Sequence, residues 1–168
     1  IAPETTLEST VQFSGDLADQ NVFSQLFQAP AGGNWQVTDG RYIGENSVDL
    51  VDLSINPAYL LELGASLQTG ASGGFVFDYY GPEDFKFVAV SVETGQVLIG
   101  HSTAKAGWVV NAAWSNSALN ATEDYSLGAT LIGNTVSVTV NGQGVLSFAF
   151  NALVTDGQFG LLAHNGAV

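Results

Sequence analysis

Apolar and polar residues alternate along most of this chain, and turn residues interrupt the alternation about every 8 to 12 positions from Gly32 onward. The clearest example is residues 135–140, in which Thr or Ser alternates with Val. Asn141-Gly142 follows, and this dipeptide is the strongest short signal for a hairpin turn, because both central residues need a positive φ. Residues 143–150 then alternate again, so the segment predicts two antiparallel strands with one buried and one solvated face.

Similar patterns predict further strands. Residues 85–92 and 96–101 flank Glu93-Thr94-Gly95, a three-residue loop with Gly where a left-handed residue is needed, and form a second predicted hairpin. Residues 22–28 have the apolar pattern of a short helix. The other predicted strands are residues 35–38, 41–44, 58–68, 75–80, 108–114, 125–132 and 159–163. About ten strands do not remain in one open sheet, so we expect two packed antiparallel sheets, a β-sandwich.

The charge of the chain excludes several partners. Three basic residues stand against 16 acidic ones, for a formal net charge of -13. Binding to nucleic acid depends on clustered Lys and Arg, so DNA and RNA are excluded as partners. Two interpretations of the charge remain, which are solubility in a salty medium and a requirement for a divalent cation. The chain has no Cys, so no disulfide stabilises the fold and no thiolate serves as a nucleophile or metal ligand.

The ends of the chain and its hydropathy bear on its setting. No apolar run approaches the roughly 20 residues of a membrane span, and the first residues have neither the basic flank nor the apolar core of a signal peptide. We therefore expect no membrane insertion. Both ends look cut from a longer chain, so we expect a single domain, residues 1–168, excised from a larger protein.

Several segments resemble the concanavalin A-like jelly rolls of bacterial extracellular proteins, including laminin G-like modules. Residues 35–42 are similar to the Trp-x-Val-x-Asp-Gly-x-Tyr hairpin that opens many of these domains. Residues 74–80, 85–90 and 95–101 are similar to their central strands. Residues 157–163 are similar to the Gly-x-x-Gly-Leu-x-Ala segment that precedes their closing strand.

The resemblance implies a two-sheet antiparallel jelly roll in a secreted or surface-anchored bacterial protein, such as an adhesin. Many such modules bind glycans and some hold Ca²⁺, so a glycan or cell-surface ligand and Ca²⁺ are the expected partner and cofactor. Other domains of a larger chain are further expected partners. The Asp-rich closing strand of the family is missing here, which leaves a metal site that uses it incomplete or absent.

Glucanases of this fold family carry Glu-x-Asp-x-x-Glu on one strand, so that a nucleophile and an acid/base flank the sugar bond. This triplet is absent from the sequence. Glu62 lies inside a predicted strand without another carboxylate two to four positions away. The sequence therefore predicts a protein that is not an enzyme, with a glycoside hydrolase built from dispersed carboxylates as an alternative.

Two tryptophans and a histidine are candidates for ligand binding. Trp108 and Trp114 are six positions apart, so a regular strand would place both on one face. On the inner face the two rings would pack in the core, whereas on the concave solvent face they could stack on sugar rings together with Tyr80. His101, at a predicted strand end, has either a structural hydrogen-bonding role or a place in a ligand groove.

The densest cluster of polar and aromatic residues lies at 78–84. Asp78 alternates with Phe77 and Tyr79, so it should point to solvent together with Tyr80. The cluster is either a solvated acidic loop or a contact for a ligand or an ion. Asp16 and Asp84 are the candidate ligands for a hard cation such as Ca²⁺, although no Ca²⁺-binding motif is present.

Together these features predict a non-catalytic extracellular adhesion or carbohydrate-binding module. Its ligand groove is expected on the concave sheet, near Asp78, Tyr80, His101 and Trp108, with Trp114 on the same face and with Ca²⁺ assisting. A structural spacer module without a small ligand is the second hypothesis, and the dispersed-carboxylate hydrolase is the third.

Overall fold

The computed structural model describes residues 9–12, 35–38, 41–44, 47–50, 60–152, 154 and 157–164, and their regular secondary structure is β-strand. No helix occurs among these residues. The strands are β1 (Ser9–Gln12), β2 (Trp35–Thr38), β3 (Arg41–Gly44), β4 (Ser47–Leu50), β5 (Leu60–Gln68), β6 (Ser72–Gly81), β7 (Asp84–Ser91), β8 (Gln96–Thr103), β9 (Gly107–Ser115), β10 (Tyr125–Ile132), β11 (Thr135–Val140), β12 (Gln143–Ala149) and β13 (Gln158–His164).

The strands form two antiparallel sheets, as the sequence predicted. The seven-stranded sheet has the order β12-β11-β10-β5-β1-β3-β2, and the six-stranded sheet has the order β4-β13-β6-β7-β8-β9. Pairs such as β5 with β10 and β6 with β13 join segments that are far apart in the sequence. Two stacked antiparallel sheets, in which the chain crosses between the layers and pairs distant strands, form the jelly-roll arrangement.

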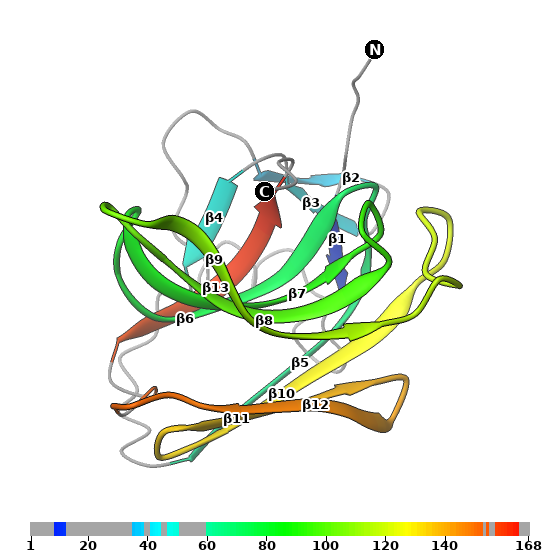
Figure 1. Ribbon diagram of the computed structural model, residues 1–168. Helices are drawn as coiled ribbons and strands as arrows, with labels where there is room; N and C mark the ends of the chain where they lie inside the picture. Colours follow the sequence, from blue (N-terminus) through cyan, green and yellow to red (C-terminus); the bar gives the residue numbers. More distant parts are fainter. Residues whose placement is uncertain are drawn as a thin grey trace.

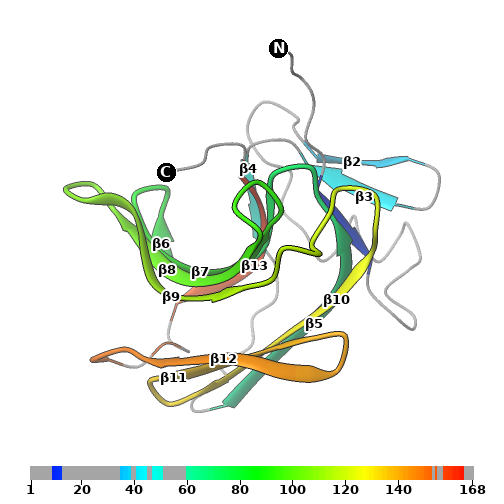
Figure 2. The ribbon, with the colours of Figure 1, turned by 45° about the vertical axis from the view of Figure 1, so that its right-hand side comes forward.

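The two layers differ in curvature. Figure 1 shows β6 to β9 and β13 as one layer, with β5, β10, β11 and β12 below it. Figure 2 shows the six-stranded sheet bent into a trough whose concave side faces away from β11 and β12. The convex side therefore packs against the seven-stranded sheet.

The main core fills the space between the sheets. From the six-stranded sheet it includes Phe75, Phe77, Val88 and Ile99, each at most 2% exposed. From the seven-stranded sheet it includes the buried face of β11, whose Thr and Ser side chains on the other face are exposed or half-buried. The predicted division of β11 into a buried and a solvated face is confirmed.

A second apolar cluster lies on the concave side of the six-stranded sheet. Its buried members alternate with the core residues along each strand, and they are Val76, Phe85, Phe87, Ala89, Leu98 and Leu162. Strands that are buried on both faces have nearly continuous apolar sequences, as residues 85–90 do. The central side chains that the structure describes on the concave face are therefore buried, whereas the sequence analysis predicted an open groove there.

The predicted turns are confirmed at their glycines. Asn141 and Gly142 have φ values of 52° and 82°, as the two-residue hairpin turn requires. Gly95 has a φ of 65° at the end of its three-residue loop. The hairpins β11–β12 and β7–β8 thus form where the turn residues predicted them.

Two short strands were not predicted, and one prediction is not tested. β1 pairs with β3 and β5, and β4 pairs with β13, so partners distant in sequence define both strands. The predicted helix at residues 22–28 lies outside the described residues. None of the described residues belongs to a helix long and apolar enough to cross a bilayer.

Candidate functional site

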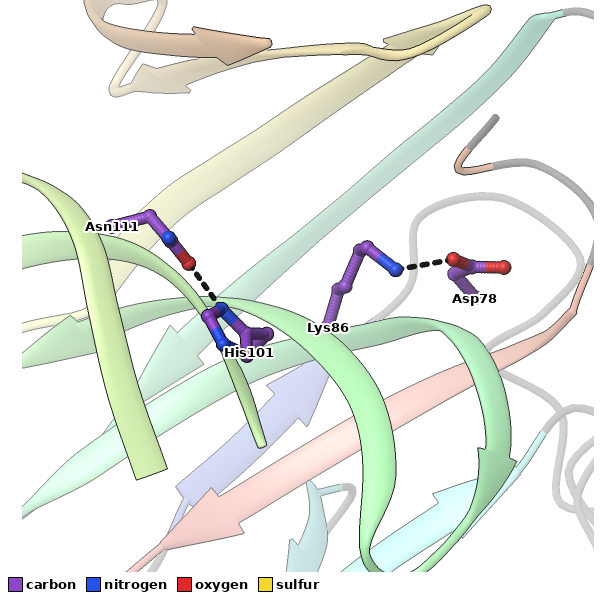
Figure 3. Close-up of polar contacts among 4 residues, drawn as sticks. All are labelled: Asp78, Lys86, His101 and Asn111. Carbon is purple, nitrogen blue, oxygen red and sulfur yellow. Dashed lines mark hydrogen bonds and ion pairs between the residues drawn. The ribbon is translucent and has the colours of Figure 1, made fainter. Parts of the chain in front are cut away.

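Four polar side chains form a row across neighbouring strands of the six-stranded sheet. They are Asp78 on β6, Lys86 on β7, His101 on β8 and Asn111 on β9, and Figure 3 shows them joined as two pairs. Lys86 and His101 are direct partners in the β7–β8 register. They continue the face that carries Val88 and Ile99, so the row lies at one end of the space between the sheets.

Asp78 is buried, with a relative exposure of 6%. Its φ of 48° is left-handed, and the β6–β7 register shifts between Phe77 and Gly81 at the same point. This irregularity breaks the alternation of β6, so Asp78 does not point to solvent. The prediction of a solvent-facing Asp78 beside Tyr80 is therefore wrong, because one irregular residue redirects the side chain.

The partner of Asp78 is Lys86. The Lys86 Nζ atom lies 2.5 Å from Oδ2 of Asp78, and 5.4 Å from the centroid of the Phe150 ring. The lysine side chain is 21% exposed. A half-buried ammonium needs an opposite charge, and here a carboxylate and the face of an aromatic ring both stabilise it.

His101 and Asn111 form the second pair. Nδ1 of His101 lies 2.6 Å from Oδ1 of Asn111. Asn111 reaches this position because β9 contains a bulge: Ile99 pairs with Ala112 and Gly100 pairs with Val110, which leaves Asn111 as an extra residue. The bulge turns the amide toward the imidazole.

The same bulge separates the two tryptophans. Trp114 packs against the core between the sheets, whereas Trp108 packs against the cluster on the concave side. The extra residue at Asn111 shifts the alternation of β9 by one position, so residues on either side of it change faces. The prediction that Trp108 and Trp114 share a face is wrong for this reason.

Trp108 lies between two other rings. Its centroid is 3.7 Å from that of Phe87, at an interplanar angle of 16°, and 3.9 Å from that of His164, at 3°. Two rings at these distances cannot occupy the same side of the indole, so Phe87 and His164 cover opposite sides. Neither face of Trp108 is open to a sugar ring.

A pocket of about 460 Å³ opens beside the polar row, between the start of β7, the end of β8, the middle of β9 and the end of β12. Its aromatic lining comes from Phe85, Phe148 and Phe150. Its polar lining includes Asp84, Lys86, His101, Asn111 and Asn151. Among the predicted site residues, the pocket brings together His101 and Asp84, but not Tyr80, Trp108 or Trp114.

The remaining predicted residues lie apart from the pocket lining. Tyr80 is 62% exposed near the end of β6. Asp16 lies outside the described residues, so its predicted role as a metal ligand is untested. Within the described part of the chain, no three His, Asp or Glu side chains gather as a metal site, and Asp84 remains the candidate cation ligand there.

The described carboxylates also bear on catalysis. Glu62 is exposed on β5, where its cross-strand partner on β10 is Thr130. Of the described residues that line the pocket, Asp84 is the only acidic one. Asp78 is held in its ion pair.

Tyr79 lies next to the pocket-lining residue Phe85, and the pKa of its phenol is shifted. Its ring stacks on Phe85, with centroids 5.5 Å apart and an interplanar angle of 26°. Burial raises the pKa of the Tyr79 phenol above its ordinary value of 10.0, because the anion loses solvation.

Sequence reasoning missed Lys86 and the rings of Phe148 and Phe150 as site residues. A signal for Lys86 was present, because alternation places it on the same face as Val88 and Val90. A charged residue on a core face requires a partner nearby. The signal for the two Phe rings was weaker, since both belong to one apolar face of the strand predicted over residues 143–150.

Comparisons with known proteins identify the fold. No protein-family model matches the chain, and no curated protein matches its sequence. Among solved structures, carbohydrate-binding module CBM66 from Bacillus subtilis matches with a TM-score of 0.67 and 16% identity, over 78% of this chain and 83% of that one.

Two glucanases match as well. The β-glucanase of Bacillus licheniformis has a TM-score of 0.55 at 17% identity, over 86% of this chain and 81% of that one. A prokaryotic β-1,3-1,4-glucanase from a mouse hindgut metagenome has a TM-score of 0.53 at 17% identity, over 82% and 79% of the two chains. The chain therefore has the concanavalin A-like jelly-roll fold.

Proposed function

We propose that this chain is a non-catalytic carbohydrate-binding module, and that the sugar binds in the pocket between β7–β9 and β12. The observation that carries the proposal is the lining of this pocket, where aromatic rings and polar groups face one space of about 460 Å³. Ligand pockets in proteins typically measure about 300 to 1,000 Å³ and combine apolar walls with a few polar groups.

The chemistry of the lining suits a saccharide. A sugar ring presents C–H groups on its faces and hydroxyl groups around its rim. The half-buried ring of Phe148 offers apolar surface to the faces, and the buried ring of Phe150 packs against it at an angle of 77°. Asp84, His101 and Asn151 offer hydrogen-bonding groups to the hydroxyls. The matched structures whose names describe carbohydrate binding or glucan hydrolysis are consistent with such a ligand on this fold.

Binding is favoured over hydrolysis by the number of carboxylates. Glycoside hydrolases generally place two carboxyl groups about 5 to 9.5 Å apart around the bond that breaks. Of the described residues in the pocket lining, Asp84 alone is acidic. A single carboxylate can accept hydrogen bonds from hydroxyls without supplying both catalytic roles.

The pocket takes the place of the concave groove in this proposal. On the concave side the central side chains are buried and both faces of Trp108 are covered. We further propose that the module acts outside the cell, as one domain of a larger chain. Ca²⁺, if it assists, would bind through Asp84 together with residues outside the described ranges, such as Asp16.

The test is glycan-array and calorimetric binding of the chain in the presence of Ca²⁺ and of a chelator. Asp84→Ala should weaken binding about tenfold, because a hydrogen bond to a charged group is lost. Glu83→Ala is the matched control, because this substitution removes the same charge from the neighbouring position. Glu83 is exposed and does not line the pocket. A folded chain that binds no saccharide in either buffer would instead favour the spacer hypothesis.

A further inference from the structure

Resting on this proposed function, we propose that the pocket selects neutral saccharides that donate a hydroxyl hydrogen to Nε2 of His101. Asn111 would set the hydrogen-bonding state of the imidazole, and the Asp78–Lys86 ion pair would exclude anionic sugars. The two parts of this selectivity come from the two pairs in the polar row.

The selection of ligands that donate a hydrogen bond follows from the contact between His101 and Asn111. Oδ1 of Asn111 is a carbonyl oxygen, which accepts a hydrogen bond and has no proton to give. With the amide in this orientation, Nδ1 of His101 carries the proton. In the neutral ring the other nitrogen, Nε2, is then an acceptor.

Nε2 makes no hydrogen bond to the residues that the structure describes, and His101 lines the pocket. A ligand that meets this nitrogen must bring a donor. Sugar hydroxyls are donors, whereas a carboxylate or sulfate group offers acceptors only.

The exclusion of anionic sugars follows from the charged residues in and beside the pocket. Lys86 is the one cationic residue among the described lining residues, and Asp78 and Phe150 already stabilise its ammonium group. Asp84 adds a carboxylate to the lining, and it forms no ion pair with the residues that the structure describes. In a chain with a net charge of -13, an anionic ligand meets repulsion without an available counter-charge.

The tautomer can be measured in the unliganded protein. Long-range proton–nitrogen NMR spectra of nitrogen-labelled protein at mildly alkaline pH should show Nδ1 protonated and Nε2 unprotonated in His101. The chain has two histidines, and His101→Gln assigns the signals. Asn111→Leu should change the His101 pattern. A proton on Nε2 in the unsubstituted protein would overturn the first part, whatever the protein binds.

Ligand selection is measured by titration with D-glucose, D-galactose, D-mannose and D-fructose as neutral probes, and with D-glucuronate as the anionic probe. We expect a neutral probe to bind and glucuronate to bind more weakly. His101→Leu should lower affinity for the neutral probe about three- to tenfold, as expected for one neutral hydrogen bond. His101→Gln, whose side-chain oxygen can replace the acceptor, should retain most of the affinity.

Three results of this titration decide the proposal. Neutral-sugar binding that is unchanged in His101→Leu would overturn the role of His101 while leaving the proposed function intact. Stronger binding of glucuronate than of glucose would overturn the charge selection. A folded protein that binds none of the probes would overturn the proposed function and the ligand selection together, and the tautomer measurement would remain as a separate result.

A gain of function provides the last test. Asp78→Asn keeps a residue type that tolerates the left-handed backbone and releases the ammonium of Lys86 into the pocket. This variant should bind glucuronate more tightly than the unsubstituted chain does. An unchanged or weaker affinity for glucuronate in the folded variant would contradict the role of the ion pair.

Discussion

The indole of Trp108 lies parallel to the ring of Phe87, with centroids 3.7 Å apart on the concave side of the six-stranded sheet. The two residues belong to strands separated by β8, and the ring of Phe87 lies over Gly100 of that intervening strand. The stack therefore connects β7 and β9 above β8. It gives Trp108 a structural role and leads to the first prediction.

Trp108→Ala should lower the free energy of unfolding by about 3 kcal/mol, since it removes a large side chain that packs against two rings. Urea denaturation measures this change. Tyr80→Ala is the comparison, because Tyr80 is 62% exposed and its loss should cost about 0.5 kcal/mol or less. Unchanged stability with lost saccharide binding would instead make Trp108 a ligand contact.

Gly100→Ala should also destabilise the fold. A Cβ atom at this position would lie 2.2 Å from the carbonyl oxygen of Val109 and 2.4 Å from Cζ of Phe87, so the strand or the ring must move. Overpacking of this kind costs about 1 to 3 kcal/mol. Gly64→Ala is the matched control on β5, where an added Cβ meets nothing within 4 Å. Equal unfolding midpoints for the two variants would contradict this packing.

The Asp78–Lys86 pair should show energetic coupling. Asp78→Asn leaves a half-buried ammonium without its carboxylate and should lower the free energy of unfolding by about 2 kcal/mol. Lys86→Met alone leaves the carboxylate buried, whereas the double variant removes both charges. A double-mutant cycle in urea should therefore give a coupling energy above about 1 kcal/mol. Additive effects of the two substitutions would mean that the pair contributes no interaction energy.

The raised pKa of Tyr79 predicts a loss of stability in alkaline solution. Because its folded-state pKa lies above the ordinary value of 10.0, the folded protein holds the phenol proton more tightly than the unfolded chain does. This contribution is fully present below about pH 10 and is lost as the pH rises through the folded-state pKa. Tyr79→Phe has no phenol proton, so its unfolding midpoint should fall less steeply over this range. Parallel pH profiles for the two proteins would refute the assignment.

Local patterns were sufficient to predict most of the fold. The bounds of β2, β3, β10 and β11 agree with the prediction, because alternation and turn residues within each segment determine them. β1 and β4 have four residues each and are defined by pairing with distant strands. Such pairing leaves little trace in a segment of this length.

The site was less predictable, because it depends on two departures from regular alternation. His101 and Asp84 were recognised as candidates, and the pocket contains both. The irregularity at Asp78 and the bulge at Asn111 decide which side chains join them. Alternation within a strand predicts a face only while the strand is regular, and nothing in residues 107–115 marks the extra residue.

The bulge in β9 makes the site depend on an insertion rather than on a substitution. A β9 strand without Asn111 would keep its pairing with β8. The side chains on one side of the deletion would, however, move to the opposite face of the sheet, so that those in the core would face the concave side and the reverse. Trp108 would leave its place between Phe87 and His164, and His101 would lose its amide neighbour. Loss of one codon in β9 would thus change both faces of the six-stranded sheet at once.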